Sequence, residues 1–496
     1  MEPTYIRFDP EHEVGSVDPR IFGGFLEHMG RAVYQGVYDP ACAHASQDGY
    51  RTDVLSALHR LKMSIMRYPG GNFASGYHWL DGIGPTSERP ITRELAWQSI
   101  EPNSFGSEEY LRLCKTMDWE PMLTVNLGTG TPEEARNWVE YCNAPAGTRY
   151  ADLRFKNGSQ AAHNVRLWCL GNEMDGPWQL GHVPAEQYAI RAQQAAKMMK
   201  DVDPSIETVV CGSSGPGMPT YIDWDRQVLE AMGDFADYIS LHRYVGNPED
   251  DILDYLAITN SIDRQIEEID IVCKYVQAKR RAPKRTFLCF DEWNVWYKNM
   301  EMNGRGQQAP HLIEEVYNLE DALVVAGFLN SFIRHADVVK VANLAQIVNV
   351  IAPIQTRGDE MLIQSIFYPF EMISRRKKGT SLKPYVYGPK YTGRKNGEVT
   401  FIDSSGILDG TRLHVFATNR NPKEAATVTV EVTQREVKAL ENAEILTGPG
   451  PKEANSYENP DLIKSQPFAA LEVRDGNACF NLPPLSFAAL TFEIKL

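Results

Sequence analysis

The sequence predicts an α/β protein in which a (β/α)8 TIM barrel precedes a small antiparallel β-sandwich, jelly-roll-like in its pattern. Between about residue 17 and residue 375, short apolar runs alternate with longer stretches of helical periodicity, which is typical of β/α units around a parallel sheet. From about residue 380, alternating strands are separated by polar turns, as in Ala426–Val432. We therefore expect the barrel in residues 17–378 and the β-sandwich in residues 379–496.

Eight of the apolar runs are strand-like, and eight strands with helices between them indicate a closed barrel. The predicted strands are Ile21–Leu26, Ser64–Tyr68, Pro121–Leu127, Val165–Leu170, Thr208–Gly212, Tyr238–Leu241, Thr286–Phe290 and Val338–Leu344. Intervening segments such as Ser107–Met117, Ala185–Lys200 and Ile262–Lys279 have apolar residues at helical spacing. Thr4–Phe8 alternates as the C-terminal strands do, so we expect residues 1–16 to add a strand to the β-sandwich.

Composition and charge exclude several classes of function. Lys and Arg number 50 against 65 Asp and Glu, a formal charge of −15 at pH 7, which repels nucleic acid and anionic membranes and favours a neutral substrate. The segment Met1–Arg7 lacks the pattern of an export signal, and no stretch is apolar for long enough to cross a membrane, so we expect a cytoplasmic protein. The eight cysteines form no CxxC pair, and Cys169, Cys211 and Cys289 lie inside predicted strands, which predicts buried, reduced thiols.

Polar residues follow every predicted barrel strand, at the ends where barrel enzymes carry their active sites. They are Glu27-His28, Arg67 with Gly70-Gly71-Asn72, Asn126, Asn172-Glu173, Ser213-Ser214, His242-Arg243-Tyr244, Asp291-Glu292 with Trp293 and Trp296, and Gln346 with Asn349. Any single member of this set can be structural, but the whole set on one rim predicts a binding site.

Two of these residues point to glycoside cleavage. Glu173 follows the fourth predicted strand and Glu292 follows the seventh, and hydrolysis of an acetal requires a carboxylic acid and a carboxylate on opposite sides of the scissile bond. A single glutamate at a strand end can equally be a solvated residue or an ion-pair partner. The prediction of a catalytic site therefore depends on the presence of two glutamates, on the fourth and the seventh strands.

Neighbouring residues fit such a site. Glycines 70 and 71 allow the backbone to approach a ligand closely, although Pro-Gly-Gly also occurs in ordinary turns. Tyr244 is a plausible donor to Glu292, while Trp296 and Trp178 are either stacking surfaces for a sugar or core residues. His28 and His242 form no HxH or HExxH pattern, so no metal site is expected.

With these motifs the chain resembles the α-L-arabinofuranosidases of glycoside hydrolase family 51. The resemblance covers nearly the whole chain, through Phe22–His28, Arg67–Asn72, Trp168–Glu173, His242–Tyr244, Asp291–Asn294 and Asn343–Asn349. It implies a retaining double displacement with Glu173 as acid/base and Glu292 as nucleophile. It further implies that Glu27, Asn72, Asn172 and Gln346 bind arabinofuranose hydroxyls, that Arg67, His242 and Tyr244 orient the carboxylates, and that Trp296 forms an aromatic wall.

The resemblance also implies an exo-acting enzyme that releases terminal non-reducing arabinofuranose from arabinan, arabinoxylan or their oligosaccharides, with no metal or organic cofactor and often as a homohexamer. Three alternatives stay open at this point. One is another retaining glycosidase with glutamates on strands 4 and 7, such as a β-xylanase or an endoglucanase, and another is a non-catalytic carbohydrate-binding protein. The third is transglycosylation as the main activity of the same residues. The segment Asn299–His311, after strand 7, is expected to overhang the cleft and to influence substrate preference.

Overall fold

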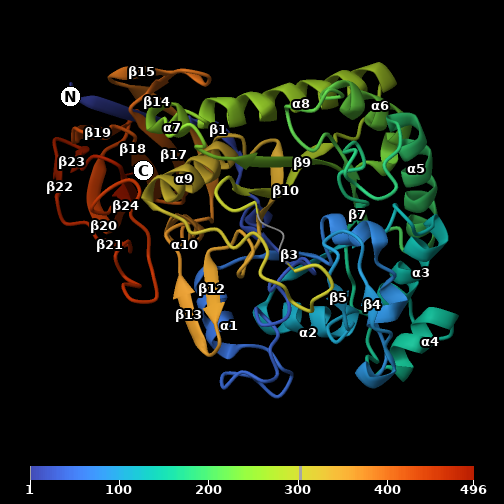
Figure 1. The fold of residues 1–496 in the computed structure, drawn as a ribbon. Coiled ribbons are helices and arrows are strands. Elements are labelled where there is room, and N and C mark those ends of the chain that lie inside the picture. The colour runs from blue at the N-terminus through green and yellow to red at the C-terminus, as the bar shows by residue number, and fades with distance from the viewer. Residues whose placement is uncertain (1, 301–303, 496) are drawn as a thin grey trace.

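The computed structural model describes residues 2–300 and 304–495. Its main element is a closed barrel of eight parallel strands, in the spatial order β10-β11-β2-β3-β6-β7-β8-β9 (Figure 1). The strands are β2 (Gly23–Phe25), β3 (Ile65–Tyr68), β6 (Glu120–Val125), β7 (Leu167–Leu170), β8 (Glu207–Cys211), β9 (Tyr238–Val245), β10 (Phe287–Val295) and β11 (Val339–Ala345). Each predicted barrel strand is present, and the predicted fold class is confirmed.

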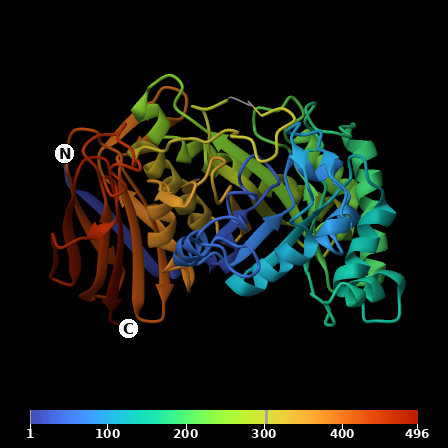
Figure 2. The ribbon, with the colours of Figure 1, turned by 60° about the horizontal axis from the view of Figure 1, so that its bottom comes forward.

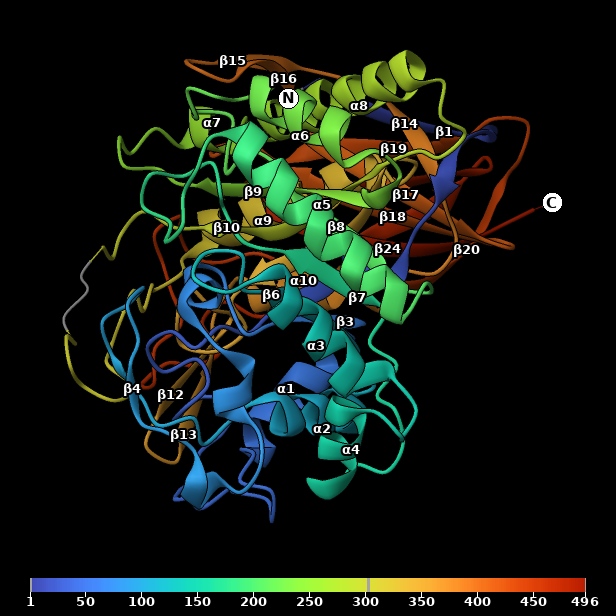
Figure 3. The ribbon, with the colours of Figure 1, turned by 90° about the vertical axis from the view of Figure 1, so that its right-hand side faces the viewer.

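Helices on the outside of the barrel connect these strands, as the view in Figure 3 shows for α3, α5 and α6. Those between barrel strands are α1 (Thr52–Arg60), α2 (Ser107–Met117), α3 (Pro132–Asn143), α4 (Arg149–Lys156), α5 (Ala185–Val202), α6 (Asp223–Met232), α7 (Ile252–Leu256), α8 (Thr259–Arg280) and α9 (Leu319–Arg334). Helix α10 (Phe367–Ser374) follows the last barrel strand. None of the helices in the described part of the chain is long and apolar enough to cross a membrane.

The barrel interior is filled by side chains, so the barrel is a packed support and not a channel. A separate cluster of buried residues draws on seven of the eight barrel strands, and Cys169 and Cys289 belong to it. Cys211 is buried as well, so all three cysteines predicted to be buried are buried. These side chains fill the space that the strands enclose.

The second unit is a ten-stranded sheet beside the barrel (Figures 1 and 2). Its strands are β1 (Thr4–Ser16), β14 (Thr380–Tyr387), β17 (Ile402–Asp409), β18 (Arg412–Asn419), β19 (Ala426–Val432), β20 (Val437–Leu446), β21 (Gln466–Pro467), β22 (Leu471–Arg474), β23 (Asn477–Leu482) and β24 (Ser486–Ile494). They pair antiparallel, except that β1 runs parallel to β19. The N-terminal strand thus lies within the C-terminal sheet, and the domain boundaries at residues 16 and 378 stay predictions.

Helix α9 joins the two units. Every residue from Leu319 to Ile333 is buried, because α9 packs on β10 of the barrel and on β14, β17, β18 and β24 of the sheet. Burial on all sides, mostly of apolar residues, is typical of a helix between two packed units. Three short hairpins complete the fold, and β4 (Thr92–Arg93) with β5 (Ile100–Glu101) forms the one that reaches the barrel mouth. The others are β12 (Ile354–Arg357) with β13 (Glu360–Ile363), and β15 (Lys390–Gly393) with β16 (Gly397–Thr400).

Candidate active site

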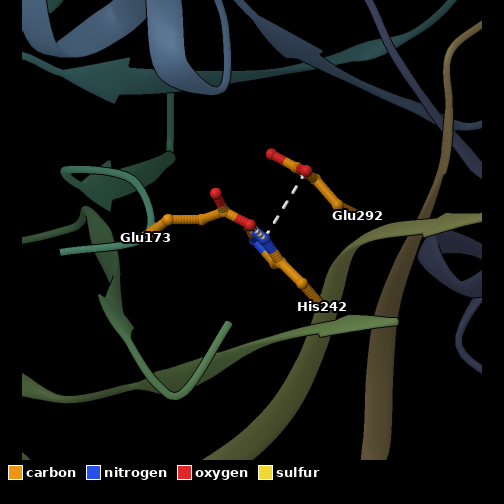
Figure 4. Close-up of side chains that lie close together, drawn as sticks. All are labelled: Glu173, His242 and Glu292. Carbon is orange, nitrogen blue, oxygen red and sulfur yellow. Dashed lines mark hydrogen bonds and ion pairs between the residues drawn. The ribbon is translucent and has the colours of Figure 1, made fainter. Parts of the chain in front are cut away.

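The carboxyl ends of β7, β9 and β10 bring Glu173, His242 and Glu292 together at the barrel mouth (Figure 4). His242 Nδ1 lies 2.9 Å from Glu173 Oε1 and 3.5 Å from Glu292 Oε2. One carboxylate oxygen of each glutamate lies within 4.8 Å of the other and of the histidine ring nitrogen. The two glutamates therefore face one another across a space that a single glycosidic bond can occupy.

Two of the strands are longer than the sequence predicts. The apolar runs end at Leu241 and Phe290, but β9 continues to Val245 and β10 to Val295, so His242, Tyr244 and Glu292 lie inside strands and not beyond them. Their polar side chains do not end the pairing, because the backbone ladder continues with Glu292 opposite His242 after an irregularity in register. Such an irregularity re-aims the side chains of the bulged strand.

Glu173 stands in a tight turn just after β7. Gly171 has a φ of 86° and Glu173 a φ of 43°, a left-handed conformation that is uncommon for residues other than glycine. Non-glycine residues persist there only where the surroundings determine the backbone, and such positions cluster at functional sites. The turn presents the Glu173 carboxylate to His242.

Arg67 is a fully buried cation that links both sides of the site. Its guanidinium donates to Glu292 Oε1 at 2.7 Å and to Asn172 Oδ1 at 2.8 Å, and its Nε lies 3.2 Å from Asp291 Oδ2. Burial alone would raise the pKa of Asp291, but Arg67 and His242 outweigh burial and lower it to about 2. The planar guanidinium fixes Glu292 and Asn172 relative to one another.

His242 and Tyr244 complete the hydrogen bonds of the two glutamates. Burial alone would lower the pKa of His242, but the charges of Glu292 and Asp291 raise it well above its ordinary value, so the ring is protonated at neutral pH. Tyr244 donates its hydroxyl to Glu292 Oε2 at 2.9 Å. Glu292 therefore accepts one hydrogen bond on each oxygen, which holds its carboxylate in a fixed orientation.

Glu27 and Gln346 form a second group beside the glutamate pair. The backbone N–H of Glu27 donates to Gln346 Oε1 at 2.8 Å, and the Gln346 amide donates to Glu27 Oε2 at 3.2 Å. Glu27 Oε1 accepts from the N–H of Phe73 at 3.0 Å and from the indole of Trp97 at 3.2 Å. The glycine turn packs closely against this group, since a Cβ on Gly71 would meet Glu27 Oε2 at 2.8 Å.

Burial, with the charge of Glu292 next in importance, raises the pKa of Glu27 from 4.5 to about 8. At neutral pH the buried group is therefore mostly protonated, and it can donate a hydrogen bond as well as accept one.

Replacing Glu27 by glutamine is expected to raise the thermal unfolding midpoint at pH 8 but not at pH 4. The folded protein holds a proton that the unfolded chain releases, so the contribution of Glu27 to stability is fully present below pH 4.5 and is lost as the pH rises towards 8. Glutamine does not ionise, and its advantage should grow to ~4 kcal/mol over this range. Thermal unfolding of both proteins from pH 4 to pH 9 tests this, and a difference that is constant with pH would contradict it.

The remaining predicted residues lie at the same mouth. The Asn172 amide donates to Asn72 Oδ1 at 3.3 Å, which brings the two asparagines together. Trp296 is half-buried and packs edge-on against Tyr244 with ring centroids 5.6 Å apart. Trp178 is 53% exposed, so it is not a core residue, and its indole donates to Glu173 Oε2 at 2.6 Å.

Some strand-end residues serve the framework instead. Asn126 accepts from the N–H groups of Gly128, Thr129 and Gly130 and so shapes the loop after β6. Asn349 accepts from the N–H of Thr356 at 2.7 Å. These two asparagines therefore support loops around the site.

Sequence reasoning missed Trp97, and it placed Asp291 at the rim without giving it a role of its own. Asp291 neighbours Glu292 in the chain, and its buried pairing with Arg67 becomes visible only in the barrel. Trp97 lies between β4 and β5 in a segment without strand or helix periodicity, so no pattern indicated its contact with Glu27.

The segment Asn299–His311 includes residues 301–303, which lie outside the described residues. In its described part, the N–H of Gly306 donates to the carbonyl of Gln98 at 2.8 Å, and the carbonyl of Gln307 accepts from Ile100 at 3.0 Å. The segment thus pairs with the hairpin that carries Trp97. That it overhangs the cleft stays a prediction.

Among the described residues, Glu173, His242 and Glu292 are the one group with the spacing of metal ligands. The surroundings do not favour a cation, because the guanidinium of Arg67 already donates to Glu292 at 2.7 Å and places a fixed positive charge beside the group. The group is better suited to proton transfer and nucleophilic attack.

Comparisons with known proteins identify relatives along most of the chain. A model of the alpha-L-arabinofuranosidase 1 domain matches residues 57–253, and a model of the alpha-L-arabinofuranosidase C-terminal domain matches residues 291–486. The intracellular exo-alpha-(1->5)-L-arabinofuranosidase 1 of Bacillus subtilis is 44% identical over 99% of both chains. The exo-alpha-(1->6)-L-arabinofuranosidase of Bifidobacterium longum is 38% identical over 99% of this chain and 97% of its own.

Solved structures agree with these relatives. A family 51 alpha-L-arabinofuranosidase from Bifidobacterium longum superposes with a TM-score of 0.96 at 34% identity, over 99% of this chain and 100% of that chain. An alpha-L-arabinofuranosidase from Thermotoga maritima, solved with arabinose, gives a TM-score of 0.88 at 32% identity, over 99% and 100% of the two chains. A bifunctional glucanase-xylanase at 13% identity and a TM-score of 0.61 shares the fold alone.

Proposed function

This chain belongs to the α-L-arabinofuranosidases of glycoside hydrolase family 51, and on that premise we propose that Glu292 is its nucleophile and Glu173 its general acid and base. The protein is an exo-acting α-L-arabinofuranosidase that cleaves with retention of configuration. Its substrates are arabinofuranosyl compounds.

The reaction takes two displacements at the anomeric carbon. In the first, a Glu292 oxygen forms a bond to that carbon as the glycosidic bond breaks, and Glu173 gives its proton to the leaving oxygen. In the second, Glu173 takes a proton from water, the water oxygen bonds to the anomeric carbon, and Glu292 leaves. Arg67 and Tyr244, each within 2.9 Å of a Glu292 oxygen, hold the nucleophile in place.

The approach of the two carboxylates is the observation that carries these assignments. Retaining glycosidases have carboxyl groups about 5–5.5 Å apart, whereas inverting enzymes need about 6.5–9.5 Å to admit a water molecule. Oxygens of Glu173 and Glu292 lie within 4.8 Å, which supports direct attack by one of the two carboxylates. The hydrogen bonds from Arg67 and Tyr244 favour Glu292 as the one that attacks.

We infer that the arabinofuranose ring binds against Glu27, Asn72, Asn172 and Gln346. A protonated Glu27 can both donate to and accept from sugar hydroxyls, and Gln346 fixes its orientation through two hydrogen bonds. Trp97 and Trp296 supply apolar surface next to this group. Since one relative is named for α-1,5 and another for α-1,6 cleavage, we propose terminal non-reducing arabinofuranose itself, on arabinan, arabinoxylan or oligosaccharides, as the recognised unit.

Two further expectations concern the whole protein. A cytoplasmic location is supported by relatives that are named intracellular. A homohexamer rests on the family resemblance alone, and light scattering of the purified protein tests it.

Initial rates on four 4-nitrophenyl glycosides test the proposed function. We expect the α-L-arabinofuranoside to be cleaved at least ~100-fold faster than the β-xyloside, the β-glucoside and the α-L-arabinopyranoside, because a hydrogen-bonding pocket discriminates against sugars that leave its polar groups unpaired. Fastest cleavage of the xyloside or glucoside would contradict the furanose pocket, and no cleavage at all would contradict the catalytic pair.

A further inference from the structure

Trp178 contacts the outer oxygen of Glu173 at the open side of the site. Its indole N–H donates to Glu173 Oε2 at 2.6 Å, while His242 Nδ1 lies 2.9 Å from Glu173 Oε1. The side chain is 53% exposed, in contrast to the fully buried Arg67 behind Glu292. Each oxygen of the Glu173 carboxyl group thus has its own donor, one buried and one at the rim.

The chain around Trp178 is arranged to place the indole there. The N–H of Gly176 donates to the carbonyl of Glu173 at 2.8 Å, which folds the segment back on itself. A Cβ on Gly176 would lie 2.5 Å from Cε2 of the Trp178 ring. The left-handed glycine positions in the chain do not include Gly176, so glycine is needed here because the ring packs against its Cα.

The terminal torsion of a glutamate is broad and roughly two-fold, so nothing in the side chain itself fixes the plane of its carboxyl group. Two donors from different directions, His242 and Trp178, fix that plane. General acid catalysis requires the proton to point at the leaving oxygen in the transition state, and a misdirected proton slows the reaction.

We propose that Trp178 is a positioning residue for proton transfer, whose indole N–H holds the carboxyl group of Glu173 in the plane that serves the leaving group. The inference rests on the proposed role of Glu173. In the first displacement the proton passes from Glu173 to the glycosidic oxygen while the bond to the anomeric carbon breaks, and in the second Glu173 regains a proton from water. Trp178 itself exchanges no atoms.

The substitution Trp178→Phe tests this, because it keeps an aromatic ring and removes the N–H. We measure kcat/KM on two substrates. The leaving group of 4-nitrophenyl α-L-arabinofuranoside departs with little protonation, whereas that of an α-1,5-linked arabinofuranosyl disaccharide must be protonated by the general acid. The expected result is a change within about twofold on the first substrate and a loss of about tenfold on the second. Losses of equal size on both, or no loss on either, would overturn the proposal.

A second variant acts through a different residue. In Gly176→Ala the new Cβ pushes the indole away without touching Glu173, and we expect the same selective loss on the disaccharide. Trp97→Phe is the matched control, because it removes the indole N–H that faces Glu27. It should lower kcat/KM on both substrates by the same factor.

Glu173→Ala in the same two assays separates this inference from the proposed function. If Glu173→Ala shows selective loss on the disaccharide but Trp178→Phe does not, the role of Trp178 is wrong and that of Glu173 stands. If Glu173→Ala shows no selectivity, the acid/base assignment and this inference fail together.

Discussion

Replacing Glu292 by alanine is expected to lower kcat/KM on 4-nitrophenyl α-L-arabinofuranoside by roughly 10⁴-fold or more. The substitution removes the group that forms a bond to the anomeric carbon, and none of the neighbouring carboxyl groups among the described residues is suited to replace it. Glu173 lies on the opposite side, Asp291 is held by Arg67 and His242, and Glu27 is mostly protonated. A good leaving group does not compensate, so the loss should be similar on aryl and natural substrates. Activity close to that of the native protein would contradict the assignment.

Azide gives a more specific test of the role of Glu292 in the same variant. A small anion can enter the space left by the carboxylate and attack from the nucleophile's face, so Glu292→Ala should convert the α-configured aryl substrate to a β-configured glycosyl azide in a single inversion. Glu472→Ala, at an exposed position of β22, is the control for effects of substitution on the fold and should retain full activity.

The second large effect is expected for Glu173→Ala. Without a general acid, kcat/KM on an α-1,5-linked disaccharide should fall by about 10³-fold, while the nitrophenyl substrate, which departs without a proton, should lose much less. Without a general base the glycosyl-enzyme should then accumulate, since its hydrolysis also needs Glu173. Equal losses on both substrates would argue against Glu173 as acid/base.

The two variants should differ in the anomer they form with azide. In Glu173→Ala the aryl substrate first forms a β-configured ester with Glu292, and azide then attacks its opposite face without a base, so two inversions give an α-configured azide. The anomer, identified by NMR, therefore reports which carboxylate was removed. The same anomer from both variants would contradict the division of roles.

The barrel could be predicted from the sequence because its strands are short apolar runs between helices of strong periodicity. The rule that barrel enzymes use the carboxyl ends of their strands then selected Glu173 and Glu292. The rule does not predict how far β9 and β10 continue. Glu292 and Tyr244 are polar, and yet both lie in the part of these strands that is still paired. Polar residues therefore did not mark the ends of these two strands.

The contacts that irregular segments make could not be predicted from the sequence, for a different reason. The hairpin of β4 and β5 has two-residue strands, and Trp97 between them reaches Glu27 only because the barrel brings distant segments together. Trp178 was open to two interpretations, stacking or core, and neither includes a hydrogen bond to Glu173. Such partners depend on the direction of a side chain, which local patterns do not determine.

The measurement that tests the central claim most directly is to trap the glycosyl-enzyme in Glu173→Ala. The variant is mixed with 4-nitrophenyl α-L-arabinofuranoside, quenched in acid, digested, and analysed by mass spectrometry. We predict that the peptide containing Asp291 and Glu292 gains the mass of one anhydroarabinose unit and that fragmentation places it on Glu292. A sugar attached to any other residue, or release of nitrophenol in a burst without any attached sugar, would contradict the account.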